Sequence, residues 1–385
     1  MRILSVHNTY QIRGGEDESR ESEERLLREK GHQVDTYEEN NDRTANSNKI
    51  QLALQTIWSS KAYNEILDQF NRSSYSLVHI QNFFPLISPA VHYAAKSKGI
   101  PVVQTLRNYR LLCPNALFFR EGNVCEDCMG KPIPYPGIIH RCYRNDLAAS
   151  TVTAAMITVH RALQTWDKQV DCFITLTDFS RNKFIEGGFP SEKIFVKPNF
   201  VYPDPGVGHG KGGYALFVGR LSVEKGLDTL LEAWPLLEHS YPLKIVGDGP
   251  WAPYVESLAA QYSHIQWLGR RPMAEVHELM GNATFLIFTS KWYETFGRVA
   301  VEAFAKGTPV VAANIGAIAE LVKDQYTGLL FSPGNAVDLA AKISWMLVHP
   351  KTVAEMRQNA RAEFEAKYTA SANYQRLMEI YSMVI

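Results

Sequence analysis

Short apolar runs alternate along this chain with longer stretches in which apolar residues recur at helical spacing. The runs have the length of buried strands and form two series, at 2–8, 76–82, 100–106 and 171–177, and at 214–220, 243–249, 265–269, 283–290 and 308–314. HQVDTYEE at 32–39, which follows the first helical stretch, is predicted as a further strand of the first series. Stretches with a helical pattern, such as 19–31, 226–237 and 297–307, separate most of them. Buried strands that alternate with amphipathic helices predict doubly wound α/β domains.

A segment rich in proline and glycine, KPNFVYPDPGVGHGKGG at 197–213, separates the two series of strands. This composition is typical of a linker. We therefore predict two Rossmann-like domains, at 1–196 and 214–369, with a cleft between them. In such sheets ligands bind beyond the carboxyl ends of the strands.

The overall composition excludes several classes of protein. Forty basic residues balance forty acidic residues among 385, so no overall charge attracts nucleic acid or an anionic membrane. The start, MRILSVHNTY, lacks the apolar length and cleavage site of a signal peptide, and no run of about 18 to 20 apolar residues predicts a membrane span. Five cysteines argue against a disulfide framework, so we expect a reduced, cytoplasmic protein.

Three glycine-containing turns after strands are candidate sites for a phosphate group. Gly14 and Gly15 lie between the first strand and a helix, where bare backbone lets N–H groups face an anion. In FVGRLSVEKG, Arg220 ends a strand and Lys225 precedes a helix, so an anion between them would offset positive charge placed near a helix N-terminus. Gly247, in VGDGPW, ends another strand. Ordinary turns and solvated cations are the alternative interpretation.

The stretch YETFGRVAVEA at 293–303 places two glutamates around the start of a helix. Glu294 falls in the loop after a strand, and Glu302 in the second turn of a helix that begins near Gly297. A diphosphate on the first N–H groups of this helix would have a carboxylate on each side, and a carboxylate accepts hydrogen bonds from vicinal hydroxyls. The pattern fits a sugar nucleotide, with ribose at one end and hexose at the other. Two exposed glutamates on a surface helix are the alternative.

These motifs together resemble those of a known family. VGR–EKG, VGDGP and E-x7-E occur in this order, and the Gly14–Gly15 loop, KPNFV and TPVVAANIGAIAELV also match. The chain resembles the family 4 retaining glycosyltransferases of GT-B architecture along nearly its whole length. The resemblance implies an N-terminal acceptor domain, a C-terminal nucleotide-sugar domain and a last helix, at about 370–385, that returns to the first domain.

The resemblance also implies roles for single residues. Arg220 and Lys225 would contact the donor diphosphate, and the Gly14–Gly15 loop would close over it. Glu294 would hold hydroxyls of the donor sugar, and Glu302 those of the ribose. The other residues expected to bind the donor are Gly247, Thr295, Phe296, Gly297 and Arg298. The implied reaction moves a sugar, as from UDP-glucose, to a hydroxyl of a glycan or lipid-linked glycan in polysaccharide biosynthesis, without a catalytic metal.

The chain departs from the family pattern at two positions. Arg107, in QTLRNYRLLCP, and Gln81, in HIQNFFP, stand where many relatives have histidine. Arginine cannot act as a general base because its pKa lies above about 12. It can stabilise charge on a leaving phosphate, and a front-face retaining reaction needs no protein base. We therefore expect Arg107 to act catalytically on the leaving diphosphate or the sugar, together with Glu294, Arg220 and Lys225.

Four cysteines lie in an insertion at about 107–146. Cys113, Cys125, Cys128 and Cys142 form the pattern C-x11-C-x2-C-x13-C, which is compatible with a structural zinc site that clamps a long loop. Unliganded thiols and a disulfide pair are the alternatives. Cys172 lies in a predicted strand and is expected in the core.

The same insertion combines basic and aromatic residues that could face a lipid headgroup or a diphosphate-linked acceptor. They are Arg107, Arg110, Arg120, Lys131, Arg141 and Arg144, with Tyr109, Phe118, Phe119, Tyr135 and Tyr143. A solvated loop is the alternative. Peripheral contact with the inner face of a membrane is therefore a hypothesis.

Two other functions stay open at this point. A nucleotide-sugar epimerase shares the architecture but needs acid and base groups around the sugar, which we cannot identify. A catalytically silent nucleotide-sugar-binding subunit is the second, because Arg107 and Gln81 differ from many relatives. An NAD dehydrogenase is poorly supported, since the first turn lacks G-x-G-x-x-G.

Overall fold

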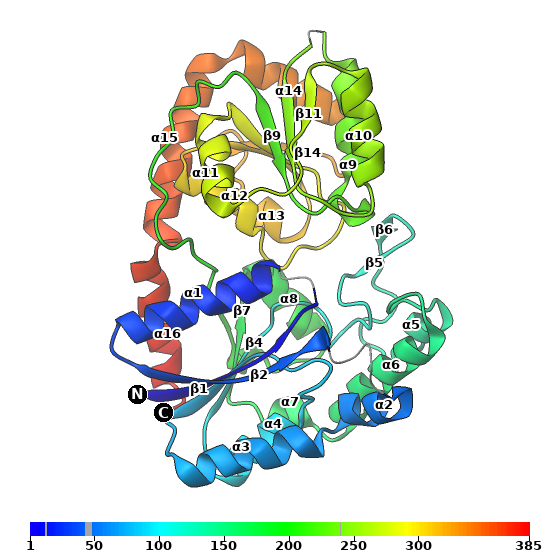
Figure 1. Ribbon diagram of the computed structural model, residues 1–385, viewed down its shortest axis with the longest axis vertical. Helices are drawn as coiled ribbons and strands as arrows, with labels where there is room; N and C mark the ends of the chain where they lie inside the picture. The colour runs from blue at the N-terminus through cyan, green and yellow to red at the C-terminus, as the bar shows by residue number, and fades with distance from the viewer. Residues whose placement is uncertain (12–13, 43–47, 239) are drawn as a thin grey trace. The chain divides into compact units, whose positions relative to one another are not determined.

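The computed structural model describes residues 1–11, 14–42, 48–238 and 240–385, which form two compact units (Figure 1). The first unit consists of Met1–Phe118, Cys125–Pro198 and Asn373–Ile385, and the second of Phe119–Val124 and Asn199–Ala372. Each unit is built on its own six-stranded sheet. Because every neighbouring pair within these two sheets is parallel, the carboxyl ends of the strands share one edge of each sheet.

The first sheet has the strand order β2-β1-β3-β4-β7-β8. Its strands are β1 (Arg2–Thr9), β2 (Gln33–Asn40), β3 (Leu77–Asn82), β4 (Val102–Thr105), β7 (Cys172–Thr175) and β8 (Ile194–Val196). The central strands are buried on both faces, which explains their nearly continuous apolar sequence.

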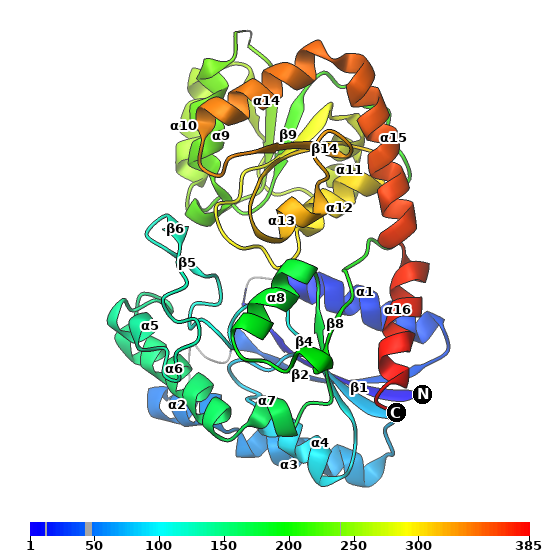
Figure 2. The ribbon, with the colours of Figure 1, turned by 180° about the vertical axis from the view of Figure 1, so that it is seen from behind.

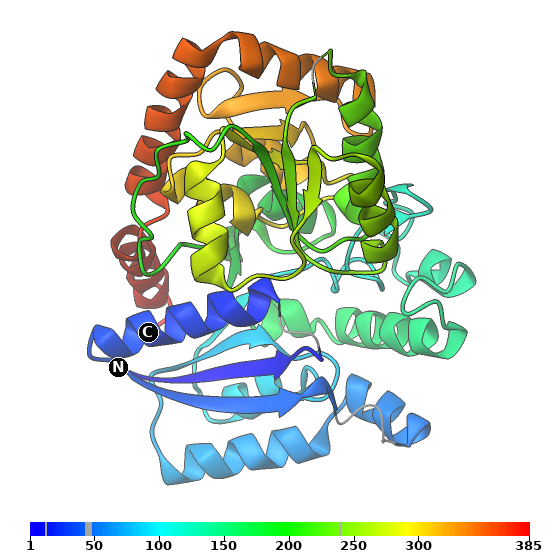
Figure 3. The ribbon, with the colours of Figure 1, turned by 45° about the horizontal axis from the view of Figure 1, so that its top comes forward.

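Helices cover both faces of this sheet. They are α1 (Gly15–Glu29), α2 (Lys49–Ile57), α3 (Ser60–Arg72), α4 (Ala90–Ser97), α5 (Tyr135–Ile139), α6 (Leu147–Ala162), α7 (Thr165–Lys168), α8 (Asp178–Glu186) and α16 (Ala370–Ser382). On one face, Leu27 of α1 and Leu377 of α16 join Ile3 and Val103 of the strands in a single apolar core. Figure 3 shows α1 above β1 and β2, with α3 on the opposite face.

The second sheet has the strand order β11-β10-β9-β12-β13-β14. Its strands are β9 (Ala215–Val218), β10 (Leu243–Val246), β11 (Ile265–Trp267), β12 (Phe285–Phe288), β13 (Val310–Ala313) and β14 (Gly328–Phe331). The helices of this unit are α9 (Leu227–Ala233), α10 (Ala252–Gln261), α11 (Met273–Asn282), α12 (Arg298–Ala305), α13 (Gly316–Leu321), α14 (Ala336–Val348) and α15 (Pro350–Lys367). Figures 1 and 2 show α9 and α10 on one face of the sheet and α11 and α12 on the other.

The predicted architecture of two Rossmann-like α/β domains is confirmed, but the sequence patterns missed two strands. β8 has three residues and β14 begins at Gly328, so neither presents a long apolar run. A short antiparallel pair, β5 (Phe119–Arg120) and β6 (Asn123–Val124), forms in the cysteine-bearing insertion. No helix in the described part of the chain is long and apolar enough to cross a bilayer.

Candidate functional site

The predicted donor-site residues of the second unit lie beyond the carboxyl ends of three strands. Arg220 follows β9, Gly247 follows β10 and Glu294 follows β12. Because β9 lies between β10 and β12 in the sheet, these three loops are neighbours. The strand order therefore brings together motifs that are widely separated in the sequence.

Glu294 and Lys225 are direct partners in this site. The Nζ atom of Lys225 lies 2.5 Å from Oε1 of Glu294. The same oxygen accepts hydrogen bonds from Oγ of Ser290 at 2.8 Å and Nε1 of Trp292 at 3.0 Å. Glu294 is 8% exposed, so the three donors compensate much of the cost of burying its charge. The sequence patterns did not identify Ser290 and Trp292, because one hydroxyl and one indole near a strand end form no recognisable motif.

Gly297 turns the chain into α12 with a backbone conformation that favours glycine. Its φ is 117°, in the left-handed region. A Cβ atom there would lie 3.1 Å from Cδ1 of Leu321 and 3.2 Å from Cδ1 of Ile318. The side chain of Phe296 is buried against Tyr368. Backbone, and not the Phe296 side chain, therefore lies next to the first N–H groups of α12. As at any helix start, these N–H groups have no partner within the helix.

Glu302 lies on the second turn of α12 and pairs with Arg298 on the first turn. Nε of Arg298 donates to Oε1 of Glu302 at 2.8 Å. Glu302 is 3% exposed. Each of the two predicted donor-site glutamates thus has a cationic partner.

The remaining turns of the second unit differ in how tightly they are packed. Gly247 has a φ of 138°, and a Cβ atom there would come within 1.8 Å of the backbone oxygen of Gly219. The ends of β9 and β10 can approach this closely only because position 247 is glycine. Arg220 is exposed, and its side chain makes no ion pair within the described ranges. Thr295 lies in the loop before α12.

The Gly14–Gly15 turn lies in the first unit, at the start of α1. The N–H of Gly14 donates to Oδ2 of Asp17 at 3.0 Å, and Asp17 also contacts Nε2 of buried His7 at 2.8 Å. Glu16, Asp17 and Glu18 place three carboxylates in the first turn, where they already offset the helix dipole. Residues 12 and 13 of the same loop lie outside the described residues. Diphosphate binding by this turn stays a prediction.

Arg107 and Gln81, the two departures from the family pattern, are hydrogen-bonded to each other in the first unit. Nε and Nη2 of Arg107 donate to Oε1 of Gln81 at 2.9 and 2.6 Å. Arg107 is 5% exposed and lies two residues beyond the end of β4. One edge of its guanidinium is therefore held in a fixed direction at the carboxyl ends of β3 and β4.

The four insertion cysteines lie near one another in the first unit. Burial, together with charge repulsion from the other three thiols, raises the pKa of Cys128 to about 12. The structure pairs none of the five cysteines in a disulfide. Within the described residues, no three His, Cys, Asp or Glu side chains are arranged to hold a metal ion. Zinc binding by Cys113, Cys125, Cys128 and Cys142 stays a prediction.

The basic and aromatic insertion is not the single exposed surface that its composition allowed. Tyr109 and Phe118 are fully buried, and Arg107 is almost fully buried. Arg110 lies over the rings of Phe84 and Tyr143. Tyr109, Phe118 and Arg107 therefore cannot face a lipid headgroup, because they are part of the packing of the loop.

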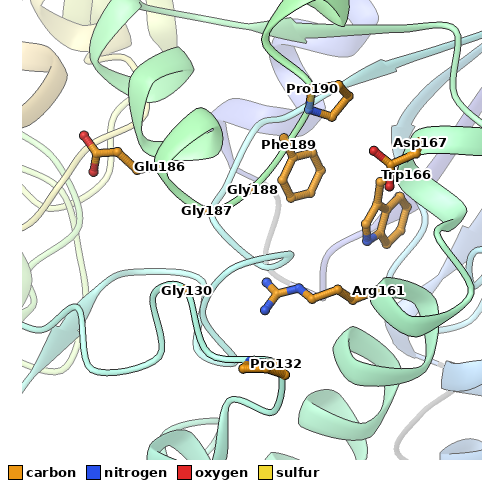
Figure 4. A pocket seen from close by; sticks show the side chains of 10 residues that line it. All are labelled: Gly130, Pro132, Arg161, Trp166, Asp167, Glu186, Gly187, Gly188, Phe189 and Pro190. Carbon is orange, nitrogen blue, oxygen red and sulfur yellow. The ribbon is translucent and has the colours of Figure 1, made fainter.

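A cavity of about 370 Å³ lies elsewhere in the first unit (Figure 4). Arg161, Trp166 and Phe189 contribute to its wall. α7 precedes β7 and the segment 187–190 precedes β8, so the cavity lies at the amino ends of these strands. In open α/β sheets ligands bind at the opposite edge, so this cavity lies outside the candidate site.

Known proteins match both the sequence and the fold. Residues 207–363 match the family Glycosyl transferases group 1. An uncharacterized glycosyltransferase of Methanocaldococcus jannaschii is 32% identical over 201 residues, 52% of this chain and 56% of that protein. A glycogen synthase of Mycobacterium tuberculosis is 32% identical over 170 residues, 42% of this chain and 41% of that protein. The chain thus matches about half of the length of these curated relatives.

The likeness in fold extends over the whole chain. HepE of Anabaena, solved in complex with UDP, superposes with a TM-score of 0.74 and 20% identity, covering 100% of both chains. The same protein with UDP-glucose gives a TM-score of 0.71 and 19% identity, covering 99% of this chain and 100% of that one. The chain therefore has the two-domain α/β fold of GT-B glycosyltransferases and matches the Glycosyl transferases group 1 family over residues 207–363.

Proposed function

We propose that this protein is a family 4 retaining glycosyltransferase, which transfers a hexose from a nucleotide diphosphate sugar to a hydroxyl of a glycan or lipid-linked glycan. The observation that carries the proposal is the start of α12, where Glu294, paired with Lys225, precedes the Gly297 turn and Glu302 follows it. The site combines the start of a helix, a lysine ammonium and two oriented carboxylates. These are the groups that a sugar linked to a ribose through two phosphates requires.

Each group of the site has a distinct role. Lys225 and the exposed Arg220 bind the diphosphate over the first turn of α12, as does the backbone from Thr295 to Arg298. Glu294 accepts hydrogen bonds from the sugar hydroxyls and Glu302 from the ribose hydroxyls. Gly247 allows the backbone after β10 to lie close to the ligand. When the diphosphate binds, Lys225 must give up part of its hydrogen bonding to Glu294, because a single ammonium cannot bind both anions equally.

The donor is a UDP-sugar, and UDP-glucose is the first compound to test. Support comes from HepE of Anabaena, which has the same fold and was solved with UDP and with UDP-glucose. The match to a glycogen synthase over 42% of this chain supports transfer to a glycan. Polysaccharide biosynthesis is the setting that fits these relatives.

The reaction proceeds on the front face of the sugar. The bond between the anomeric carbon and the diphosphate oxygen breaks, and the acceptor oxygen bonds to the same face of that carbon. The acceptor proton passes to the departing phosphate oxygen, so no side chain must act as a base. Arg107 supports the negative charge of the departing diphosphate, which grows in the transition state. Arg220, Lys225 and the start of α12 supply the positive potential that a metal ion supplies in other transferases.

A donor screen followed by a transfer assay tests the proposal. A nucleotide sugar that binds the folded chain raises its melting temperature, and UDP-glucose is expected to do so more than the free sugar. With a glycan acceptor, the product must keep the anomeric configuration of the donor, and Glu294→Ala must abolish transfer and donor hydrolysis. Inversion of the configuration, formation of an epimer from the donor alone, or binding without turnover would contradict the proposal.

The acceptor side is proposed to contact an anionic membrane through helices α2, α5 and α6. Both α2 and α5 pack against α6, and Figure 2 shows the three helices side by side. Their exposed apolar residues are Ile50 and Leu54 near α2, Ile133, Tyr135 and Ile139 near α5, and Leu147 and Leu163 near α6. The exposed Lys49 and Arg141 belong to the same segments. Apolar side chains with basic neighbours are typical of a surface that binds anionic lipids.

Co-sedimentation with vesicles tests this contact. The protein is expected to bind vesicles that contain phosphatidylserine and not vesicles of phosphatidylcholine alone. Leu54→Glu should weaken binding, whereas Val337→Glu should not, although Val337 is similarly exposed, at 70% against 65% for Leu54. Equal loss in the two variants, or no binding to either vesicle, would rule the contact out.

A further inference from the structure

A buried chain of hydrogen bonds runs from Lys197 to Arg107 inside the first unit. Nζ of Lys197 donates to Oε2 of Glu23 at 2.6 Å. Nε2 of Gln81 donates to Oε1 of the same carboxylate at 2.6 Å. Oε1 of Gln81 then accepts both bonds from Arg107. All four side chains are at least 95% buried.

The chemistry of these groups determines the orientation of each member. An ionised carboxylate only accepts hydrogen bonds, so Gln81 must turn its NH₂ group towards Glu23. The amide oxygen of Gln81 is then directed at Arg107, whose guanidinium only donates. A reversed amide would place a donor against a donor and an oxygen against a carboxylate. Glu23 thus determines the direction of Arg107 without touching it.

The charges in this cluster favour the ionised form of Glu23. Burial by itself raises the pKa of Glu23, but its interactions with Lys197, His79 and Arg107 lower it to about 2. The cluster of Lys197, Glu23, Gln81 and Arg107 has two positive charges and one negative charge. Gln81 carries no charge, so it holds Arg107 without neutralising the positive charge that the support of a leaving anion requires.

Three further elements hold Glu23 and Gln81 in place. Nδ1 of His79 lies 2.7 Å from the hydroxyl of Tyr381 on α16, and its Nε2 lies 2.8 Å from Oγ1 of Thr105. The ring of His79 lies next to Glu23, with Nδ1 3.4 Å from Oε1. Nζ of Lys197 also donates to Oδ1 of Asn373 at 3.3 Å. The contacts from β3, β4 and α16 leave the carboxylate little freedom to move.

We propose that Gln81 and Glu23 are positioning residues, which direct the guanidinium of Arg107 towards the departing diphosphate. This inference rests on the role proposed above for Arg107. It also explains why arginine at position 107 occurs with glutamine at position 81: a neutral acceptor holds the guanidinium in place and does not itself neutralise its charge. A carboxylate at position 81 would hold Arg107 equally well but would neutralise it and repel Glu23.

Four variants separate positioning from general damage to the fold. Gln81→Leu removes the acceptor of the Arg107 hydrogen bonds. Glu23→Gln removes the carboxylate that orients the Gln81 amide. Gln104→Leu is the matched control, since Gln104 lies on the adjacent strand β4, is 4% exposed against 3% for Gln81, and contacts His92 instead of Arg107. Arg107→Ala measures the full contribution of the guanidinium. Thermal unfolding of each variant identifies those that fail to fold.

The expected result is a loss in kcat of about 10- to 100-fold for Gln81→Leu and Glu23→Gln, with the KM for the donor within about threefold of the parent. Gln104→Leu should retain kcat. The double variant Gln81→Leu/Arg107→Ala should be no slower than Arg107→Ala, because positioning has no effect once its target is absent. Guanidinium ions added to Arg107→Ala should restore part of its activity, and this rescue should disappear when Gln81→Leu is added.

Other outcomes have different consequences. If Arg107→Ala is slow and Gln81→Leu is as fast as the parent, Arg107 keeps its role and the positioning inference is wrong. If Gln81→Leu and Gln104→Leu lose activity equally, the effect is a packing defect and the inference is also wrong. If Arg107→Ala turns over at the full rate, the catalytic role of Arg107 fails first, and the positioning role fails with it.

Discussion

Lys225 and Glu294 lie 69 positions apart in the sequence, yet Nζ of one lies 2.5 Å from Oε1 of the other. One residue comes from the turn after β9 and the other from the loop after β12. The pair joins the proposed diphosphate site to the proposed sugar site. Occupation of one half of the donor site must therefore change the electrostatics of the other half.

Replacement of Lys225 with methionine is expected to weaken the binding of UDP by about 10- to 100-fold, the equivalent of one charge-assisted hydrogen bond. Glu294→Gln should weaken the binding of UDP-glucose but change the affinity for UDP little. Isothermal titration calorimetry measures both. Lys291→Met is the matched control, because Lys291 is a nearby lysine paired with Asp228 at 2.5 Å. A similar loss in this control would assign the effect to general charge and not to the Lys225–Glu294 pair.

Glu302 is expected to recognise the ribose of the donor through its hydroxyls. The parent protein should bind UDP more tightly than its 2′-deoxy analogue, since the analogue lacks one hydroxyl donor to the carboxylate. Glu302→Gln should bind UDP more weakly and should distinguish the two ligands less. Competition binding with both nucleotides measures the difference. A variant that discriminates as well as the parent would remove Glu302 from the ribose site.

Acid should destabilise the first unit in a range set by its buried histidines. Burial lowers the pKa of His92 to about 4, whereas an unfolded histidine titrates near about 6.5. The unfolded chain therefore binds more protons between these values, so this contribution is fully present above pH 6.5 and is lost as the pH falls towards 4. The loss from one such group is about 3 kcal/mol.

Urea unfolding at neutral pH and near pH 5 measures this effect. His92→Gln should show a smaller decrease in the free energy of unfolding between the two pH values than the parent. The exposed His209 provides the control variant His209→Gln, which should behave like the parent. If all three proteins lose the same free energy, the buried ring is not the titrating group.

The cysteine insertion is expected to contain one zinc ion per chain. Cys128→Ser should remove it, because the pKa of Cys128 is raised by all three of the other insertion thiols, as expected for a central member of the group. Metal analysis of purified protein is the measurement. Cys172→Ser is the control, since this thiol is buried in β7 and is not part of the pattern. Absence of zinc in the parent, or its retention in Cys128→Ser, would contradict the prediction.

The sequence patterns were sufficient for the architecture and for placing the candidate donor-site motifs in loops that follow strands. Apolar runs of strand length that alternate with helical periodicity gave both sheets, because a strand buried on two faces must be apolar throughout. The glycines and carboxylates at 293–303 indicated the start of α12. Of the strands in the two six-stranded sheets, β8 and β14 were missed, since a strand of three or four residues has too little periodicity to be distinguished from a loop.

Partnerships between distant residues depend on the tertiary structure. Arg107 and Gln81 were noticed as separate departures, and Lys197 only as part of a linker; their connection through Glu23 follows from the order β1-β3-β4-β7-β8 and the packing of α1. The burial of Tyr109 and Phe118 likewise could not be read from composition. Local patterns determine which elements form, because periodicity and turn chemistry act over a few residues. Which side chains meet is decided by strand order and packing, which act across the whole unit.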